Sequence, residues 1–142
     1  MRIDLDILQN WIAPQSRVLD LGCGSGSLLS KLVAEKNITG YGIEIDQEKI
    51  TRCIERRVNV IEQDLDAGLR NFANGSFDTV VMAQTLQAVR YPRLVLDEML
   101  RVGRECIVSL PNFGHWRSRF YLALRGHQFW PLAFAVLFGF AR

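Results

Sequence analysis

Short apolar runs alternate with amphipathic segments along most of this chain. Five runs rich in apolar and β-branched residues predict strands, at Arg17–Leu21, Thr39–Glu44, Val58–Glu62, Phe77–Met82 and Glu105–Leu110. Segments with apolar residues one helical turn apart follow Gly26, occupy 47–57 and begin at Pro92. Nearly continuous apolar strands that alternate with such helices indicate a parallel sheet covered on both faces. The predicted fold class is therefore α/β, a Rossmann-like, doubly wound and mostly parallel sheet of about five strands.

The last part of the chain departs from this alternation. Residues 116–125 mix arginines with aromatic residues, and Phe120, Tyr121 and Leu124 lie at helical spacing, which predicts a helix with one buried face and a basic exposed face. An uncharged apolar segment follows at Phe129–Phe140, shorter than the roughly 20 residues that span a bilayer. We expect no stable membrane insertion, and either a helix that packs back on the core or an altered or truncated end.

Composition limits the classes of partner and compartment. The 142 residues suit a single core. The net charge of +2, from 17 basic and 15 acidic residues, is too small to indicate a nucleic-acid partner. Cys23, Cys53 and Cys106 lie far apart without a Cys-x-x-Cys pair, which argues against a zinc site and a disulfide framework. We therefore expect no bound metal. No secretory signal pattern is present at the start, so we expect a cytoplasmic protein.

A glycine-rich turn follows the first predicted strand. It reads Asp20-Leu-Gly22-Cys-Gly24-Ser-Gly26, and the missing side chains let the backbone turn tightly and approach a ligand beside a helix N-terminus. A dinucleotide fingerprint would require Gly or Ala where this chain has Ser27, which disfavours NAD. The spacing instead resembles motif I of class I S-adenosylmethionine-dependent methyltransferases, in which this loop holds the amino-acid end of the cofactor.

Two further acids end the next predicted strands. Glu44 lies 18 positions after Gly26, close to the roughly 20-residue offset of an acid that binds ribose hydroxyls. Asp64 follows the third strand, where the methyltransferase pattern places an acid against the adenine amino group and an apolar residue, here Leu65, against the ring. Asp66 could compete with Asp64 for this role, and Asp64 alone would more often be a turn or helix cap. Together Asp20, Glu44 and Asp64 form a more specific signal than any one of them.

Four stretches make the resemblance more specific. They are RVLDLGCG at 17–24, YGIEID at 41–46 with NVIEQDLD at 59–66, AQTLQA at 83–88 and SLPNFGHWR at 109–117. With these stretches the chain resembles the methionine-biosynthesis MetW family over most of residues 1–125. The resemblance implies a domain over 1–125 that binds S-adenosylmethionine or S-adenosylhomocysteine, with Gln84 among the cofactor-binding residues, and an apolar segment over 126–142 that is part of this domain or an atypical end.

The resemblance also implies a function. Members of the family act with a homoserine O-acyltransferase of the MetX type, so an accessory role is expected rather than an enzyme with an established methyl acceptor. The alternative is a methyltransferase that acts on an unidentified small molecule. His115 is a weak candidate for a general base, because a lone histidine before an arginine-rich segment more often caps a helix or joins an interface. The family continues into further strands, so the acceptor side of the fold is expected to be missing or altered here.

Overall fold

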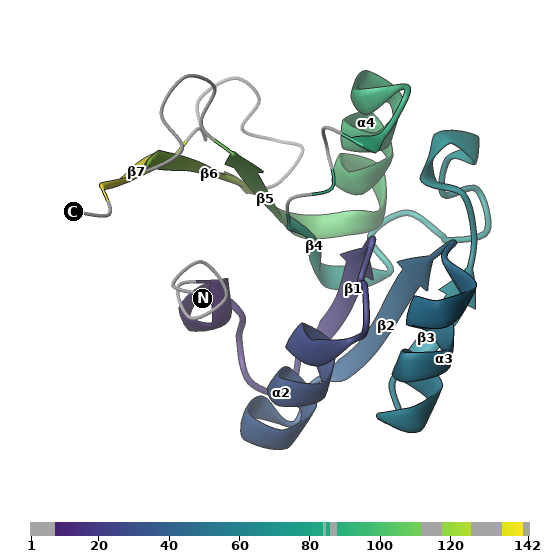
Figure 1. The fold of residues 1–142 in the computed structure, drawn as a ribbon. Helices are drawn as coiled ribbons and strands as arrows, with labels where there is room; N and C mark the ends of the chain where they lie inside the picture. Colours follow the sequence, from purple (N-terminus) through teal and green to yellow (C-terminus); the bar gives the residue numbers. More distant parts are fainter. Residues whose placement is uncertain (1–7, 84, 86–87, 112–117, 126–134, 141–142) are drawn as a thin grey trace.

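The computed structural model describes residues 8–83, 85, 88–111, 118–125 and 135–140, with side chains up to Val108 (Figure 1). Residues 8–11 are helical, and they precede the elements β1 (Arg17–Leu21), α2 (Ser27–Lys36), β2 (Thr39–Glu44), α3 (Gln47–Glu55), β3 (Asn59–Glu62), η1 (Leu65–Ala67), β4 (Phe77–Ala83), α4 (Pro92–Val102), β5 (Gly103–Pro111), β6 (Ser118–Arg125) and β7 (Ala135–Phe140). None of the described helices is both long and apolar enough to cross a membrane.

One sheet contains all seven described strands, in the order β3-β2-β1-β4-β5-β6-β7. The first five are parallel to one another, and each falls on a predicted strand within two residues at either end. The chain builds outward from β1 to β3 and then returns to place β4 on the other side of β1. This reversal puts the carboxyl ends of β1 and β4 beside each other, which is where doubly wound sheets bind their ligands. The α/β prediction is confirmed.

The prediction of a helix over 116–125 is wrong for the part that the structure describes. β6 is an antiparallel strand whose register places Cys106 opposite Leu124 and Val108 opposite Leu122. In the sequence, Phe120, Leu122 and Leu124 also recur every second residue, so the pattern fits a strand as well as a helix. The open edge of β5 favours the strand, because backbone groups there need hydrogen-bond partners.

The apolar segment near the C-terminus is likewise not helical where it is described. β7 pairs antiparallel with β6, with Tyr121 opposite Leu137 and Phe120 opposite Phe138. Figure 1 shows β5, β6 and β7 continuing the sheet away from α4 and α2. The alternative of a helix that packs back on the core is therefore wrong for residues 135–140, whereas 126–134 lie outside the described part.

Two apolar clusters cover the two faces of the parallel sheet. On one face, Leu19, Leu21 and Met82 pack with Val95 and Met99 of α4. The other face packs against α2, α3 and the opening helical residues, and its members are Leu8, Ile12, Val18, Cys23, Leu28, Leu29, Leu32, Ile38, Cys53, Val81 and Ile107. Because side chains alternate along a strand, the acid at the end of β1, Asp20, shares the second face with Val18.

Candidate functional site

The glycine loop after β1 runs in a backbone conformation that favours glycine. Gly22, Gly24 and Gly26 have φ angles of 69°, 59° and 77°. Backbone hydrogen bonds hold the loop against β2, because the N–H groups of Gly22 and Cys23 both donate to the carbonyl of Ile43, at 2.8 and 3.0 Å. The neighbouring strand therefore holds the loop in place through backbone hydrogen bonds alone.

Thr85 lies directly over Gly22. A Cβ atom added to Gly22 would be 2.6 Å from both Cγ2 and Oγ1 of Thr85. Thr85 is itself oriented by its hydroxyl, which donates to the carbonyl of Ala83 at 3.1 Å. By contrast, a Cβ on Gly24 would meet nothing within 4 Å, so this glycine is open on its outer side. The loop is thus closed at Gly22 and accessible at Gly24.

Glu44 ends β2 and holds the middle of the glycine loop. Its Oε2 accepts from the Gly24 N–H at 2.9 Å, and its Oε1 accepts from the N–H groups of Ile45 at 2.9 Å and Asp46 at 3.2 Å. The residue is buried, with 9% of its surface exposed. A carboxylate offers about four acceptor positions, so about one remains for a ligand. Glu44 can therefore hold the loop and still accept a further hydrogen bond.

Asp20 lies beneath this loop. It is 3% exposed, and burial together with the nearby charge of Glu44 raises the pKa of the Asp20 carboxyl to about 7. Desolvation disfavours the charged form of an acid, and a second carboxylate acts in the same direction. The Asp20 side chain is thus a buried acid that titrates near neutral pH and influences the charge of the site from below.

Asp64 and Asp66 occupy the turn after β3. Asp64 Oδ1 accepts from the Asp66 N–H at 3.0 Å and so caps η1. This is the helix-capping role that the sequence analysis gave as the alternative to ligand binding. Asp66 binds elsewhere: its carboxylate accepts from the backbone N–H groups of Arg90 and Tyr91, just before α4. The buried Leu65 lies between these two acids.

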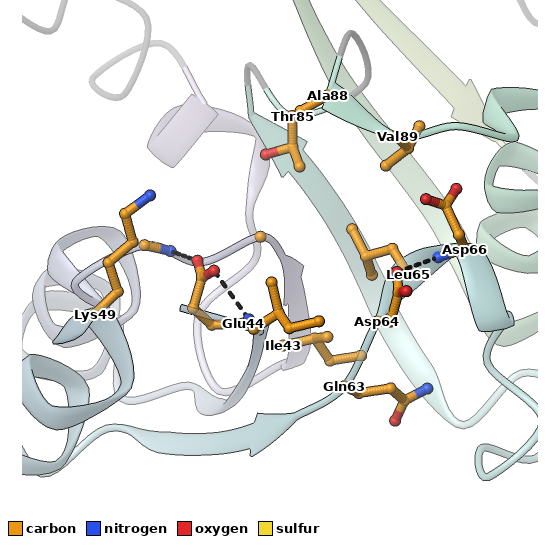
Figure 2. A pocket seen from close by; sticks show the side chains of 13 residues that line it. Ile43, Glu44, Lys49, Gln63, Asp64, Leu65, Asp66, Thr85, Ala88 and Val89 are labelled. Atoms are coloured by element: carbon orange, nitrogen blue, oxygen red, sulfur yellow. Dashed lines mark hydrogen bonds between the residues drawn. The ribbon is translucent and has the colours of Figure 1, made fainter. Parts of the chain in front are cut away.

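These elements surround one cavity of about 300 Å³, which we call the strand-end cavity (Figure 2). Its lining residues are Gly22, Gly24, Ile43, Glu44, Ile45, Lys49, Gln63, Asp64, Leu65, Asp66, Thr85, Ala88 and Val89. The volume is at the lower end of the roughly 300 to 1,000 Å³ typical of small-molecule sites. Figure 2 shows Glu44 and Lys49 on one side and Asp64, Leu65 and Asp66 on the other.

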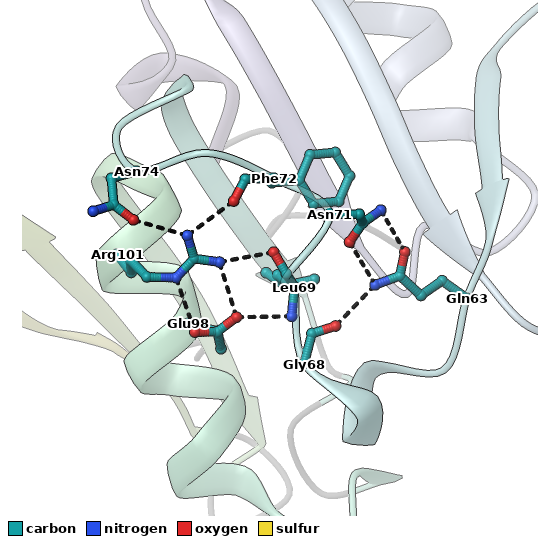
Figure 3. Close-up of polar contacts among 8 residues, drawn as sticks. All are labelled: Gln63, Gly68, Leu69, Asn71, Phe72, Asn74, Glu98 and Arg101. Atoms are coloured by element: carbon teal, nitrogen blue, oxygen red, sulfur yellow. Dashed lines mark hydrogen bonds and ion pairs between the residues drawn. The ribbon is translucent and has the colours of Figure 1, made fainter.

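The loop over 68–74, behind Asp64, is held by Gln63 on one side and by α4 on the other (Figure 3). Gln63 Nε2 donates to the carbonyl of Gly68 at 2.8 Å, and the side-chain amides of Gln63 and Asn71 bond each other in both directions. Arg101 donates to the carbonyls of Leu69 and Phe72 and to Asn74 Oδ1. It also forms an ion pair with Glu98, with Nε 2.9 Å from Oε1. The loop beside the cavity is therefore fixed from its outer side.

The structure brings together most, but not all, of the residues that the sequence suggested. Gly22, Gly24, Glu44, Asp64 and Leu65 line the strand-end cavity, whereas Asp20 and Gly26 are not among its lining residues. A Cβ on Gly26 would be 3.1 Å from Cys53 Sγ and from Val58, so this glycine serves the packing of the loop on α3. Gln84 and His115 lie outside the described residues.

Sequence reasoning missed several lining residues. Ile45 is 58% exposed although it is a large apolar residue, and it lines the cavity, as does Lys49. Its position directly after Glu44 was the available signal. Ala88, Val89 and Thr85 come from the segment after β4, and only the tertiary structure shows that they face the glycine loop.

The three cysteines are buried and reduced. Cys23 and Cys53 lie with their sulfur atoms 3.8 Å apart under the glycine loop, and burial is the largest cause that raises the pKa of both thiols. Thiols with raised pKa values are poor nucleophiles. Among the described residues, no group of three or more His, Cys, Asp or Glu side chains is placed to hold a metal ion.

Solved structures with a similar fold define the class of this fold. An S-adenosylmethionine-dependent methyltransferase from Geobacter sulfurreducens, solved with S-adenosyl-L-homocysteine, superposes with a TM-score of 0.68 at 20% identity over 81% of this chain and 50% of its own. Another such methyltransferase, from Thermotoga maritima, gives 0.63 at 23% identity over 76% of this chain and 50% of its own. The fold is that of the class I S-adenosylmethionine-dependent methyltransferases.

Sequence comparison is more specific. The family described as "Methionine biosynthesis protein MetW" matches residues 2–133, and the chain belongs to this family. It is 37% identical over 136 residues to a bifunctional methionine biosynthesis protein MetXA/MetW of Rhodopirellula baltica. The aligned region covers 90% of this chain and 22% of the relative. A demethylmenaquinone methyltransferase of Renibacterium salmoninarum is 32% identical over 74% of this chain and 46% of its own. The chain spans less than half the length of these two relatives.

Proposed function

We propose that this MetW-family protein binds S-adenosylmethionine or S-adenosylhomocysteine in the strand-end cavity. One observation carries the proposal: the glycine loop and Glu44, joined by the hydrogen bond from Gly24, lie across a single cavity from Asp64 and Leu65. The match of the fold to S-adenosylmethionine-dependent methyltransferases supports this class of ligand.

Each lining group suits one part of such a ligand. Gly24, which is open on its outer side, lets the backbone approach the amino-acid end, while the remaining acceptor position of Glu44 suits a ribose hydroxyl. The free oxygen of Asp64 suits the adenine amino group, and Ile45 and Leu65 provide apolar contacts for the ring. Asp20 is outside the lining and would act through its charge, which favours the cationic ammonium and sulfonium groups when it is ionised.

We further propose that this protein, with its cofactor bound, acts on a homoserine O-acyltransferase. The support comes from the relative in Rhodopirellula baltica, whose name joins MetXA and MetW in one chain. Two proteins that occur fused are expected to work beside each other, and a short linker would give them a high effective concentration. In this interpretation the cofactor controls the partner and is not consumed.

The second candidate is a methyltransferase that acts on a small molecule. The 32% identical relative named as a demethylmenaquinone methyltransferase favours this possibility. Methyl transfer can proceed by proximity and orientation of donor and acceptor, so the reaction does not depend on a nucleophile or general base. His115 remains the candidate base for an acceptor that must lose a proton.

Two measurements test the proposal. Titration calorimetry with S-adenosylhomocysteine decides whether the ligand binds, and no heat of binding from folded protein would contradict the cofactor role. The second measurement is the rate of acyl transfer to homoserine by the acyltransferase of the same organism, with and without this chain. It distinguishes an accessory protein of the acyltransferase from a methyltransferase. A large rise in rate supports the accessory function. An unchanged rate, with methyl transfer found in an acceptor screen, would support the second candidate instead.

A further inference from the structure

Asp66 connects the strand-end cavity to the start of α4. Its Oδ1 accepts from the N–H groups of Arg90 at 2.8 Å and Tyr91 at 2.9 Å, and its Oδ2 accepts from Arg90 at 3.1 Å. These groups are 24 and 25 residues away in the sequence. The contact is therefore a tertiary one between η1 and the segment that leads into α4.

This carboxylate is bound to the backbone at the start of α4. The helix begins at Pro92, which has no N–H, and its N-cap residue Tyr91 forms no side-chain cap. Asp66 accepts from the N–H groups of Arg90 and Tyr91, directly before the first helical residue, and a negative charge at a helix N-terminus also interacts favourably with the helix dipole. Without it, the N–H groups of Arg90 and Tyr91 would lose their acceptor.

The residues directly before Arg90 form part of the cavity wall. Ala88 and Val89 both line the strand-end cavity, and the Ala88 N–H donates to the carbonyl of Thr85 at 2.9 Å. Figure 2 shows the Asp66 carboxylate directed toward Val89. The same carboxylate therefore lies at the cavity and fixes the backbone that supplies the neighbouring part of its wall.

We propose that Asp66 is a positioning residue for cofactor binding: by holding the backbone N–H groups of Arg90 and Tyr91, it fixes Ala88 and Val89 against the ligand. The proposal rests on the function proposed above. It assigns Asp64 and Asp66 different tasks, since Asp64 has an oxygen free to meet the adenine amino group and Asp66 acts through the backbone of the adjacent wall.

The first experiment compares S-adenosylhomocysteine affinities by calorimetry for the wild type, Asp66→Ala and Asp78→Ala. Asp78 is a matched control, because its carboxylate also accepts from a backbone N–H, that of Arg17 at 2.8 Å, at the opposite end of the parallel strands. We expect Asp66→Ala to weaken binding by about tenfold, because part of the binding free energy must then order the released wall. Asp78→Ala is expected to bind within about twofold of the wild type.

A second experiment separates positioning from direct contact with the base. The probe is an S-adenosylhomocysteine analogue with purine in place of adenine, which lacks the exocyclic amino group. If Asp66 acts through the backbone, Asp66→Ala weakens the two ligands by the same factor, whereas Asp64→Ala weakens the analogue less. A penalty for Asp66→Ala that disappears with the analogue would overturn the proposal, because it would show direct contact.

Hydrogen exchange provides a readout that does not depend on ligand. In Asp66→Ala the amides of Arg90 and Tyr91 should exchange faster, and Asp66→Asn, which keeps one acceptor oxygen, should be intermediate in exchange and in affinity. If Asp66→Ala does not fold, Asp66→Asn decides the question by the same two measurements. Unchanged exchange and affinity in a folded variant would refute the positioning role.

The failures of the two proposals are distinguishable. Absence of binding by the wild type would contradict the cofactor role and this inference with it. Binding by the wild type that Glu44→Ala weakens and Asp66→Ala leaves unchanged would overturn the role of Asp66 alone.

Discussion

The carboxylate of Glu44 accepts a hydrogen bond from the backbone N–H of Gly24 across 2.9 Å, so the acid that ends β2 also fixes the loop that follows β1. Two neighbouring strands thereby contribute to the site through one contact. Glu44 is buried and accepts from two further N–H groups of its own turn. In the proposed function its effect on the cofactor is consequently both direct, through the remaining acceptor position, and indirect, through the shape of the glycine loop.

Replacing Glu44 should weaken cofactor binding. We expect Glu44→Ala to lower the calorimetric affinity for S-adenosylhomocysteine by about 1.5 to 3 kcal/mol, the range for hydrogen bonds to charged groups. Glu44→Gln should also weaken it, because an amide has one oxygen and cannot accept on both sides as Glu44 does. Glu62 provides the control, since it is the parallel-register partner of Glu44 on β3 but is exposed and does not line the cavity. Equal affinity in Glu44→Ala would remove its role.

Gly22→Ala should destabilise the fold more than Gly24→Ala. Both positions have positive φ, which costs a residue with a Cβ atom roughly 1 to 2 kcal/mol. Only at Gly22 does the new Cβ also meet Thr85 at 2.6 Å, and such overpacking typically adds about 1 to 3 kcal/mol. Urea unfolding measures both changes in the free energy of unfolding.

A second-site variant checks the cause of that difference. Combining Gly22→Ala with Thr85→Gly removes the atoms that the new Cβ would meet but leaves the positive φ, so stability should recover toward that of Gly24→Ala. Equal stability of the Gly22→Ala and Gly24→Ala single variants would show that the loop yields without cost and that the contact with Thr85 is unimportant.

Asp20 should make stability fall as pH rises toward neutrality. Its pKa is about 7 in the folded protein against 3.8 for an ordinary aspartate, so between these values the folded state binds more protons than the unfolded state. The slope of the free energy of unfolding against pH is then negative, with a total contribution of at most about 4 kcal/mol. Asp20→Asn cannot titrate and should lose this part of the slope.

Urea unfolding of the wild type and Asp20→Asn at several pH values between about 4 and 8 tests this expectation, because other titrating groups contribute alike to both. Parallel stability curves would contradict a raised pKa for Asp20. Since the charge of Glu44 is the second cause of the shift, Glu44→Gln should reduce the difference between the two curves.

Arg101→Lys should loosen the loop behind Asp64. Arg101 reaches the carbonyls of Leu69 and Phe72 and the Glu98 carboxylate at once, whereas an ammonium cannot reproduce this planar set of donors. Because the side chain is 30% exposed, we expect a loss of only about 1 to 2 kcal/mol in the free energy of unfolding. Arg93→Lys, on the exposed side of the same helix, should change it by less than about 0.5 kcal/mol.

The parallel strands and the glycine loop were predictable because their signals are local. Val18, Leu19 and Leu21 form a short apolar run, and Gly22 follows it at once, so a few adjacent residues define a buried strand and its turn. The same holds for Glu44, whose distance from the loop along the chain already indicated a shared site.

The remaining features depend on contacts between distant residues. Nothing adjacent to Thr85 in the sequence indicates that it lies on Gly22, and nothing near Asp66 indicates that it binds the N–H of Tyr91. β6 was missed for a different reason: Phe120 and Leu124 satisfy the spacing of a helix and that of a strand, and the sheet edge that decides between them is formed by β5.

The reversal of the strand order has a consequence for how the strand-end cavity forms during folding. The residues around the cavity come from the ends of β1, β2 and β3 and from the segment after β4, and parallel neighbours can pair only after the crossover between them has closed. Non-local pairings of this kind form slowly, because loop closure costs entropy before contacts repay it. The cavity is therefore a property of the assembled sheet. The time at which ligand binding first appears during refolding would show when the last of these strands pair.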